Sequence, residues 1–387
     1  MIMNKMKVVV IFGSRSVEHE VSVVTAMQIL ANLDKNKYEI IPIYIDKQGK
    51  WWSGESLKKI ENYKNLELKN KVGLTEYHSW IDGKDMKIMP INGIFRKPIE
   101  FDIILPAIHG TYGEDGTLQG MLEMANVPYT GCGVTAAAVG MDKVIQKAVY
   151  EREGLPVVKY EWFLVKDYSE NKNGIIENLE KKIGYPMCVK PANLGSSVGI
   201  NMAYDKKELE WSIDVAKEFD TKILIEECLK DIDEINVSVM GYEEVQVSVC
   251  EQPIKNNTLL SYEDKYMKGG KTKGMANLSR LVPAPISDKL TKQIQSYALR
   301  AFKALGVSGV ARIDFLVNIK KEIVYINEIN TLPGSLSFYL WEKSGYPFAK
   351  MLDKLIELGF ERYNKRNKIN YVYDSGLLKK TSKGSKY

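Results

Sequence analysis

The stretch SGVARIDFLVNIKKEIVYINEINTLPG, residues 308–334, holds two apolar runs separated by a short polar turn. This pattern predicts an antiparallel β-hairpin. Because side chains alternate between the two faces of a strand, Arg312 and Asp314 are expected on one face of the first strand. By the same rule Glu328 and Asn330 share one face of the second strand. The hairpin is therefore expected to gather charged and amide groups at one end.

Two carboxylates, one amide oxygen and one guanidinium thus come together just before Pro333 and Gly334 break the second strand. Hard oxygen ligands of this kind suit Mg²⁺, which takes one or two carboxylates and completes its shell with water and phosphate oxygens. The alternative is a solvated hairpin face with surface ion pairs. We favour the metal site, because four polar residues recur at the same spacing inside strands that are otherwise apolar.

The composition is that of an ordinary soluble globular protein, with a hydrophobic share of 45% and a charged share of 27%. The 387 residues are enough for two or three domains with a buried core. A net charge of +5 does not call for nucleic-acid binding, although it would favour anionic small molecules. The cysteines fit no zinc spacing and are expected to be reduced; they are Cys132, Cys188, Cys228 and Cys250.

Neither a signal peptide nor a membrane span is expected. The first apolar run ends before Arg15 and Glu18, so it is too short for the core of a signal peptide. No apolar run approaches the roughly 20 residues that are needed to span a membrane. We therefore expect a cytoplasmic protein that does not act at a membrane.

The N-terminal part begins with a buried strand over 7–12, a short glycine-containing loop and a helix over 17–33. This order opens a doubly wound α/β domain, which binds ligands at the carboxyl ends of its strands. The loop lacks the G-x-G-x-x-G fingerprint, which argues against a dehydrogenase. Residues 46–98 are polar and poorly periodic, and we interpret them as an irregular insertion. A further strand over 101–108 ends at His109 beside a glycine-dense loop, which favours a functional role for this histidine.

A second domain is expected after a boundary near Gly140. Its strand that carries Lys190 runs directly into residues 192–199, a loop with two glycines and two serines. Such a loop can place backbone N–H groups and hydroxyls over phosphates while the lysine supplies charge. It is not a P-loop, because no G-K-[ST] follows the second glycine. An ordinary hairpin turn is the alternative, and the oxygen-rich hairpin at 308–334 favours the phosphate site.

A third region begins near Leu229 and contains a lysine- and glycine-rich stretch, 267–273, with the composition of a mobile lid. Residues after Tyr371 read as a disordered basic tail. The expected division is an α/β N-terminal domain (1–140), central (141–228) and C-terminal (229–372) α+β parts, and a tail (373–387).

The motifs taken together resemble those of the D-alanine–D-alanine ligases of the ATP-grasp superfamily, including the related ligases of vancomycin resistance. The resemblance covers residues 6–369 and rests on the order and spacing of VEHEVSVVTA, HGTYGEDGTLQGMLE, MDK, VKPANLGSSVG, EDKY, ARIDF and NEINTLPG. It implies an ATP-grasp fold with a Rossmann-like N-terminal domain. The implied reaction joins two D-alanines with ATP, through an acyl phosphate, to make D-alanyl-D-alanine for peptidoglycan.

The resemblance also implies a nucleotide site between the central and C-terminal domains. Lysines would contact the phosphates beside the serines of the glycine loop, the segment 226–229 would meet the adenine, and Glu234 would bind the ribose. The implied ATP ligands are Lys143, Lys190, Ser196, Ser197, Glu226, Glu227, Cys228, Leu229, Glu234 and Lys265. Two Mg²⁺ ions, or Mn²⁺ in their place, would be held by Asp314, Glu328 and Asn330.

For the amino acids, the resemblance implies that Glu18 pairs with the ammonium of the first substrate, with His109 close by. Ser196 and Tyr266 would complete a hydrogen-bonded brace around Glu18 that closes the lid. Arg312 and the backbone N–H of Gly334 would stabilise the tetrahedral oxyanion.

The sequence departs from the family pattern after N-T-x-P-G. The serine that usually receives the carboxylate of the second substrate is replaced by Tyr339, with Ser335 and Ser337 as substitutes. D-alanine is the expected second substrate, D-serine is the alternative, and D-lactate fits less well because Lys265 and Tyr266 match the dipeptide-forming pattern. The resemblance further implies a homodimer.

Overall fold

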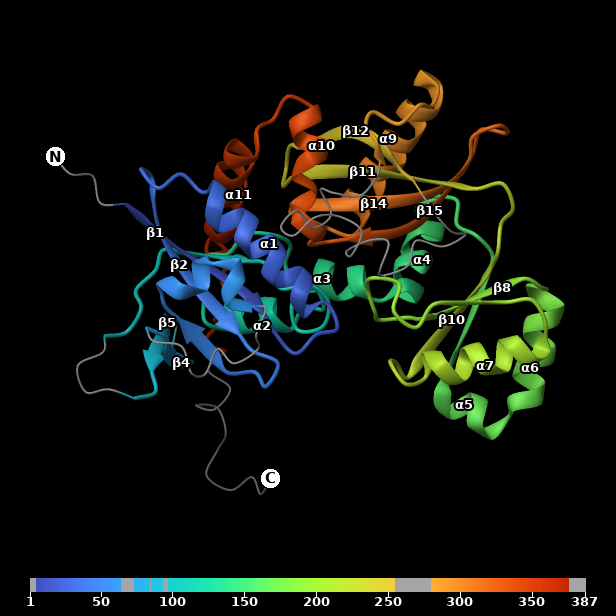
Figure 1. Cartoon of the computed structure of the whole chain (residues 1–387), viewed down its shortest axis with the longest axis horizontal. Helices are drawn as coiled ribbons and strands as arrows, with labels where there is room; N and C mark the ends of the chain where they lie inside the picture. Colours follow the sequence, from blue (N-terminus) through green and yellow to red (C-terminus); the bar gives the residue numbers. More distant parts are fainter. Residues whose placement is uncertain (1–4, 64–72, 84, 93–96, 255–279, 376–387) are drawn as a thin grey trace.

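The computed structural model describes residues 5–63, 73–83, 85–92, 97–254 and 280–375. These residues form three β-sheets with flanking helices, which we call the N-terminal, central and C-terminal sheets (Figure 1). Lys265, Tyr266 and the expected lid 267–273 lie outside the described residues. So does most of the expected tail, from residue 376 onward.

The N-terminal sheet has the order β5-β4-β3-β2-β1-β6. Its parallel part consists of β1 (Met6–Gly13), β2 (Tyr38–Ile45) and β6 (Ile103–Pro106). On one face, Val8, Val10 and Phe12 of β1 pack in a core with α1 (His19–Asn32) and α11 (Phe348–Arg366). On the other face, Val9 and Ile11 pack with α2 (Thr117–Met124). The predicted doubly wound α/β arrangement is therefore confirmed, and α11 returns from the far end of the chain to complete it.

The expectation of an irregular insertion over 46–98 was wrong. This region adds β3 (Trp51–Ser53), β4 (Thr75–Asp82) and β5 (Asp85–Pro90) to the sheet as antiparallel strands. Two short 3₁₀ helices, η1 (Glu55–Lys58) and η2 (Ile60–Tyr63), follow β3. The missed signal is the pair Asp82-Gly83, which is typical of a tight hairpin turn, with Gly83 at φ +62°. β4 shows no clear alternation of apolar and polar residues in the sequence, because it is largely exposed.

The central sheet is antiparallel, with the order β7-β10-β8-β9. Its strands are β7 (Tyr160–Leu164), β8 (Met187–Pro191), β9 (Asn201–Ala203) and β10 (Lys222–Glu227). Its helices are α5 (Val165–Glu170), α6 (Lys172–Lys182) and α7 (Lys206–Ala216). Apolar residues of α6 and α7 cover one face of this sheet. Two helices connect the central part to the N-terminal sheet: α3 (Val134–Met141) and α4 (Lys143–Arg152).

The C-terminal sheet is also antiparallel, with the order β13-β12-β11-β14-β15. Its strands are β11 (Asp233–Gly241), β12 (Val245–Pro253), β13 (Arg280–Leu281), β14 (Gly309–Asn318) and β15 (Ile323–Asn330). The amphipathic helix α9 (Asp288–Ala304) covers one face, where Ile313 and Phe315 are fully buried. A 3₁₀ turn, η5 (Gly334–Ser337), and α10 (Phe338–Lys343) follow β15. The predicted hairpin of β14 and β15 is thus confirmed.

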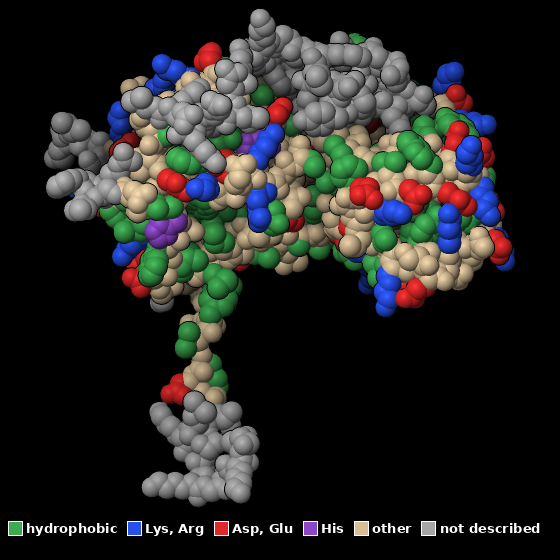
Figure 2. Space-filling view, turned by 60° about the horizontal axis from the view of Figure 1, so that its bottom comes forward, with side chains coloured by type: hydrophobic (Ala, Val, Ile, Leu, Met, Phe, Trp, Pro, Cys, Tyr) green, Lys and Arg blue, Asp and Glu red, His purple; other side chains and the backbone are tan. Residues whose placement is uncertain are grey.

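In Figure 1 the N-terminal sheet lies at one side with α1 and α11, and the central and C-terminal sheets lie at the other. Residues 367–375 are exposed, and Figure 2 shows the end of the described chain leaving the body as an extended segment. In the part of the chain that the structure describes, no helix has the length and apolar character that a membrane crossing needs.

Candidate active site

The face of the C-terminal sheet opposite α9 carries rows of polar side chains. Asn236 on β11 is paired with Asp314 on β14, which is paired with Glu328 on β15. The neighbouring row on the same face pairs Arg312 with Asn330. Residues in register on adjacent strands point to the same side of a sheet. The hairpin therefore brings together the four polar residues that its sequence pattern predicts.

A β-bulge is what allows this register. Phe315 is paired with Ile326, but Asp314 is paired with Glu328, so Asn327 is the extra residue on β15. Such an insertion bends the strand and re-aims its side chains, and bulges are frequent beside active sites. Without it, Asp314 would be opposite Asn327 and the two carboxylates would not face each other.

Asp314 is held in a dense set of polar contacts. Arg312 donates to both of its oxygens, from Nε at 2.6 Å and from Nη2 at 2.7 Å. The Asn330 amide donates to Asp314 at 3.1 Å. Burial raises the pKa of Asp314 to about 6, although the Arg312 charge opposes the shift. Arg312 and Asp314 thus form a bidentate buried pair, which fixes the guanidinium plane.

The oxygens of Asp314, Glu328 and Asn330 fit Mg²⁺ better than a metal that needs an all-protein cage. The described residues hold no cluster of three or more histidines, cysteines or carboxylates around one point. Two carboxylates and one amide leave coordination positions for water and phosphate oxygens, which is the usual Mg²⁺ arrangement. The assignment of these three residues as metal ligands stays a prediction.

Two buried lysines share one carboxylate on the central sheet. Glu226 on β10 lies 2.5 Å from the ammonium of Lys190 and 2.6 Å from that of Lys147 on α4. Burial raises the pKa of Glu226, but the two lysines outweigh it and lower that pKa to about 2. Lys190 also approaches the side-chain oxygen of Asn327 at 3.5 Å, so it lies beside the bulge. Lys190 is therefore placed between the central sheet and the polar hairpin.

Replacing Lys147 by methionine is expected to destabilise the protein by about 3–5 kcal/mol, because it removes one partner from a buried ion pair. The side chain of Lys147 is 1% exposed. The KM for ATP should change less than in Lys190→Met, since Lys190 is the lysine that lies beside the hairpin. Thermal unfolding and ATP kinetics measure the two effects. Lys166→Met, which breaks an exposed pair with Glu170, is the matched control. An equal loss of stability in Lys147→Met and Lys166→Met would contradict this prediction.

Lys143 lies between the glycine loop and the hairpin. Its ammonium donates to the carbonyl oxygen of Leu194 at 2.7 Å and lies 3.4 Å from a Glu328 oxygen. Asp142 accepts from the N–H groups of Val144 and Ile145, which caps the helix that Lys143 begins. The cap fixes the first turn of α4 and so the direction in which the side chain of Lys143 points away from the helix.

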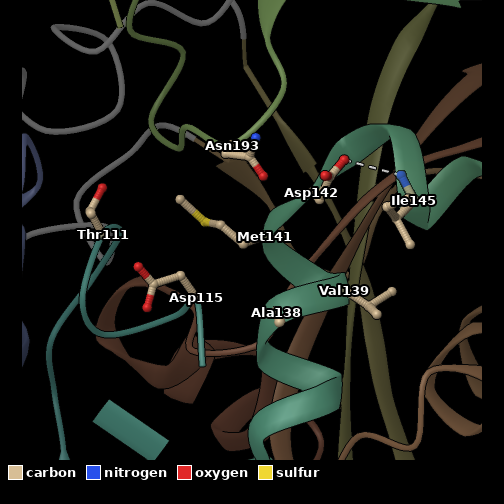
Figure 3. Close-up of a pocket in the computed structure, with 8 residues that line it drawn as sticks. All are labelled: Thr111, Asp115, Ala138, Val139, Met141, Asp142, Ile145 and Asn193. Carbon is tan, nitrogen blue, oxygen red and sulfur yellow. Dashed lines mark hydrogen bonds between the residues drawn. The ribbon is translucent and has the colours of Figure 1, made fainter. Parts of the chain in front are cut away.

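A cavity of about 490 Å³ opens beside this helix start. Figure 3 shows Asn193 and Asp142 above it and Thr111 and Asp115 at its other side. Its remaining lining residues are Ala138, Val139, Met141 and Ile145. The cavity therefore separates the loop that follows His109 from the glycine loop of the central part.

Glu18 connects the N-terminal part to the glycine loop. It is 5% exposed, occupies the N-cap position of α1 and accepts a hydrogen bond from the Ser196 hydroxyl. A Cβ atom added at Gly195 would lie 2.6 Å from Glu18 Oε2, and one at Gly110 would be equally close. Glycine is required at both positions because the carboxylate fills the space that a side chain would take. The predicted contact between Ser196 and Glu18 is thus present.

His109 is 2% exposed, and both ring nitrogens are engaged. Nδ1 lies 2.8 Å from the carbonyl oxygen of Leu332, so this nitrogen carries the proton. Nε2 then accepts from the Thr25 hydroxyl at 2.8 Å, and Thr25 accepts from the N–H of Ser335 at 3.0 Å. Burial lowers the pKa of His109 to about 4, which keeps the ring neutral. His109 therefore fixes the loop after β15 to α1, and its contact with substrate stays a prediction.

Two family models match this chain, the D-ala D-ala ligase N-terminus over residues 7–132 and the D-ala D-ala ligase C-terminus over residues 149–357. The D-alanine–D-alanine ligase of Thermosipho africanus is 42% identical over 368 residues, which are 95% of this chain and 97% of the relative. The chain belongs to the D-alanine–D-alanine ligase family.

Solved structures of this family have the same fold. The D-alanine–D-alanine ligase from Coxiella burnetii is 29% identical with a TM-score of 0.81, over 94% of this chain and 96% of the other. The VanG D-Ala:D-Ser ligase from Enterococcus faecalis is 30% identical with a TM-score of 0.77, over 92% of this chain and all of the other. The expected ATP-grasp fold is thereby confirmed.

The segment that is predicted to bind the nucleotide lies at the end of β10. Glu227 accepts the backbone N–H of Lys159 at 2.9 Å, and Cys228 donates its own N–H to the Pro186 carbonyl at 3.1 Å. Glu234 on β11 accepts from Asn236 at 3.4 Å, so it borders the polar row. The roles assigned to Glu226, Glu227, Cys228, Leu229, Glu234 and Ser197 in nucleotide binding stay predictions.

The segment in which the chain departs from the ligase pattern has an unusual backbone. Ser335, Leu336 and Ser337 all have positive φ, at 56°, 51° and 52°. The Ser337 hydroxyl is fully buried and has no hydrogen-bond partner among the described residues. Tyr339 is 9% exposed and directs its hydroxyl to Glu251 at 2.9 Å. The second-substrate roles assigned to Ser335, Ser337 and Tyr339 stay predictions.

Three charged residues of this ligase, of which Lys147 and Glu251 are buried and Glu114 is half-buried, were missed from the sequence. Glu114 accepts the N–H groups of Gly110 and Leu332, and so connects the loop after His109 to the loop after β15. Its signal was an acid inside a glycine-dense loop at a strand end. Lys147 lies four residues after Lys143 and so on the same side of α4. Glu251 is a carboxylate that directly follows the run VSVC, residues 247–250.

Proposed function

We propose that this chain joins two D-alanines to D-alanyl-D-alanine in an ATP-dependent reaction, through an acyl phosphate of the first D-alanine. The observation that carries the proposal is the hairpin register, which puts Asp314 opposite Glu328 and Arg312 opposite Asn330 on one face. The site also needs residues from distant parts of the chain, and the contact between Glu18 and Ser196 joins two of them.

In this proposal the carboxylates of Asp314 and Glu328 and the amide oxygen of Asn330 hold two Mg²⁺ ions. When bound, these ions neutralise the charge that spreads over the transferred phosphoryl group. Lys143 and Lys190 add fixed positive charge on the side of the glycine loop. They are held by the contacts with Leu194 and Glu226, so little reorganisation is needed when phosphate arrives.

Glu18 is proposed to receive the ammonium of the first D-alanine. A carboxylate oxygen of this D-alanine attacks the γ-phosphorus of ATP, and ADP leaves. The amine of the second D-alanine then attacks the acyl carbon, and inorganic phosphate leaves. Arg312 and the N–H of Gly334 stabilise the tetrahedral oxyanion between these steps. Lys265 would neutralise the phosphoryl group, and Tyr266 would complete the brace around Glu18; both lie outside the described residues.

The test is ATP-dependent phosphate release with Mg²⁺ and D-alanine, with the products identified by mass. The expected product with D-alanine alone is D-alanyl-D-alanine. D-serine and D-lactate are added in separate reactions, because Tyr339 replaces the usual serine. A dominant D-alanyl-D-serine product at neutral pH would favour the alternative function, for which VanG is a structural neighbour. If the amino acids do not stimulate phosphate release, the result would contradict ligase activity.

Asp314→Asn is expected to raise the Mg²⁺ concentration for half-maximal activity by about tenfold or more, because a neutral amide is a weaker ligand than a carboxylate. Initial rates across a Mg²⁺ titration measure this effect, and Mn²⁺ binding in the presence of ADP measures it without turnover. Asp214→Asn, on the exposed face of α7, is the control. An unchanged Mg²⁺ requirement would remove Asp314 from the ligand set.

The cytoplasmic location and the homodimer are further parts of the proposal. The first is the expectation drawn from the sequence, and the second comes from the family resemblance. Sedimentation velocity of the full chain, with the expected mass twice 43.9 kDa, tests the second of them.

A further inference from the structure

A buried histidine, His19, directly follows Glu18, the carboxylate that is proposed to bind the first substrate. His19 begins α1 and is 3% exposed. Its Nδ1 lies 2.6 Å from the carbonyl oxygen of Ser14, and its Nε2 lies 2.9 Å from the hydroxyl of Tyr44 on β2. Both ring nitrogens are therefore engaged, one by the loop that precedes α1 and the other by the neighbouring strand.

The two partners of His19 determine which nitrogen carries the proton. A carbonyl oxygen can only accept, so Nδ1 donates to Ser14 and Nε2 accepts from the Tyr44 hydroxyl. Burial lowers the pKa of His19 and raises the pKa of Tyr44, so at neutral pH the ring is uncharged and the phenol keeps its proton. The two rings also meet edge to face, with their centres 5.5 Å apart. The imidazole is thus held in one tautomer and one orientation.

The residue to which His19 donates has a backbone conformation that serine rarely adopts. Ser14 has φ +86°, in the left-handed region, and follows Gly13 at φ +94°. Such a conformation persists where surrounding contacts hold it in place. The Ser14 N–H donates to the carbonyl oxygen of Ile45 at 2.7 Å, and the Ser14 carbonyl oxygen accepts from His19. His19 therefore supplies one of the bonds that hold the backbone at Ser14.

The same loop carries Glu18. Ser16 accepts the N–H of Glu18 on its hydroxyl oxygen at 3.1 Å and the N–H of His19 on its carbonyl oxygen at 3.2 Å. The side chain of Glu18 then reaches the hydroxyl of Ser196 in the central part. A relaxation of the backbone at Ser14 would shift Ser16, and with it the backbone of Glu18. The position of the Glu18 carboxylate consequently depends on the bond between His19 and Ser14.

The alternative is that His19 is a core histidine that contributes to stability alone. Stability depends on both ring bonds, since breaking either of them leaves a buried polar group without its partner. The position of Glu18 depends on the bond to Ser14, because Tyr44 lies on β2 and not on the loop that carries the carboxylate. The two roles therefore predict different effects when the two bonds are removed one at a time.

We propose that His19 is a positioning residue for Glu18, and that its Nδ1–H fixes the loop at Ser14 so that the carboxylate meets the ammonium of the first D-alanine. This inference rests on the proposed ligase function and adds a residue to its first-substrate subsite. A misplaced carboxylate binds the ammonium more weakly, so the loss of the bond should appear in the KM for the first D-alanine.

The experiment separates the two ring bonds by means of two amides. Asparagine places its side-chain nitrogen near the position of Nδ1, so His19→Asn can still donate to Ser14. Glutamine places its amide near the position of Nε2, so His19→Gln can accept from Tyr44 and does not reach Ser14. We expect His19→Gln to raise the KM for the first D-alanine by about tenfold, and His19→Asn to raise it by less than about threefold.

Hydroxylamine in place of the second D-alanine makes the assay specific for the first subsite. Its nitrogen attacks the acyl carbon of the acyl phosphate, which gives the hydroxamate and inorganic phosphate. At a saturating concentration of hydroxylamine, the dependence of hydroxamate formation on D-alanine reports the first subsite. The KM for ATP should stay within about twofold of the wild type in both variants, because the proposed change is confined to Glu18. An equal rise of the KM for ATP and for D-alanine in His19→Gln would overturn the inference.

Thermal unfolding of the same samples measures stability. Each amide keeps one of the two ring bonds, so His19→Asn and His19→Gln should unfold at similar temperatures. If His19 serves stability alone, the two variants will also have similar KM values for the first D-alanine, and this result would overturn the inference. His78→Gln is the matched control, since His78 is an exposed histidine on β4 beside the ring of Trp80, and it should change neither quantity.

A double variant keeps the inference testable if His19→Gln does not fold. His19→Leu with Tyr44→Phe replaces both members of the buried bond by apolar groups of similar size, so no phenol hydroxyl is left without an acceptor. It also removes the donor to Ser14, so we expect the raised KM for the first D-alanine to persist. A wild-type KM in this double variant would overturn the inference. A wild-type enzyme that forms neither dipeptide nor hydroxamate would instead contradict the proposed function.

Discussion

Arg312→Lys is expected to lower kcat by about 100- to 1,000-fold, with a much smaller effect on stability. Lysine keeps the positive charge beside Asp314, so no buried carboxylate is left without a partner. It cannot reproduce the two parallel bonds that fix the guanidinium plane, from Nε at 2.6 Å and from Nη2 at 2.7 Å. The charge would remain but would no longer be aimed at the oxyanion.

The rate effect is measured by initial dipeptide formation at saturating substrates, and stability by thermal unfolding of the same samples. Arg362→Lys is the control, because Arg362 also pairs with a carboxylate, Glu123 at 3.0 Å, and stacks on Tyr129. It lies on α11, outside the polar rows. Comparable losses of kcat in the two variants would mean that Arg312 acts through packing and not on the reacting atoms.

The part of the fold that could be predicted from the sequence is the part in which apolar and polar residues follow a clear pattern. The hairpin over 308–334 was predicted because polar and apolar residues alternate across two buried strands, and its register confirms that pattern. The parallel strands were predicted because they are short, continuous apolar runs. The antiparallel extension β3–β5 was missed because an exposed strand has no apolar face to reveal its period.

The site was predicted where one short motif holds several of its residues, and it was missed where partners come from distant motifs. Arg312, Asp314, Glu328 and Asn330 lie on one hairpin, so strand geometry alone places them together. Glu251 and Tyr339 are 88 positions apart in the sequence, and no local pattern of residues predicts the hydrogen bond between them. The bulge at Asn327 was also unpredictable, because an inserted residue leaves the composition of the strand unchanged.

Glu114 gives a pH dependence of stability with the opposite sign to that of an ordinary paired carboxylate. Burial first, and then the charge of Glu18, raise the pKa of Glu114 from 4.5 to about 8. Between these two values the native state keeps a proton that the unfolded chain has lost. The contribution of Glu114 to the free energy of unfolding is therefore present in full below pH 4.5 and is lost as pH rises through about 8. The slope reaches about 1.4 kcal/mol per pH unit at most.

Glu114→Gln is expected to flatten this slope, because the amide is neutral at every pH. Its one oxygen can accept from only one of Gly110 and Leu332, since these two N–H groups bond to different oxygens of Glu114. The difference in stability between the variant and the wild type should therefore shift in favour of the variant as pH rises through about 8. Glu114→Ala should be less stable at all pH values, since it leaves two N–H groups without their acceptor, at about 1–3 kcal/mol each. Thermal unfolding of each variant from pH 5 to pH 9 measures the slopes, with the exposed Glu177→Gln as the control.

The proton on Glu114 has a consequence for the neighbouring carboxylate. With Glu114 neutral, Glu18 can carry the negative charge that the ammonium of the first D-alanine needs, without a second anion beside it. Glu114→Gln should therefore keep the KM for the first D-alanine near that of the wild type at pH 7, whereas Glu18→Gln should raise it. An unchanged stability slope in Glu114→Gln would contradict the assignment of this proton to Glu114.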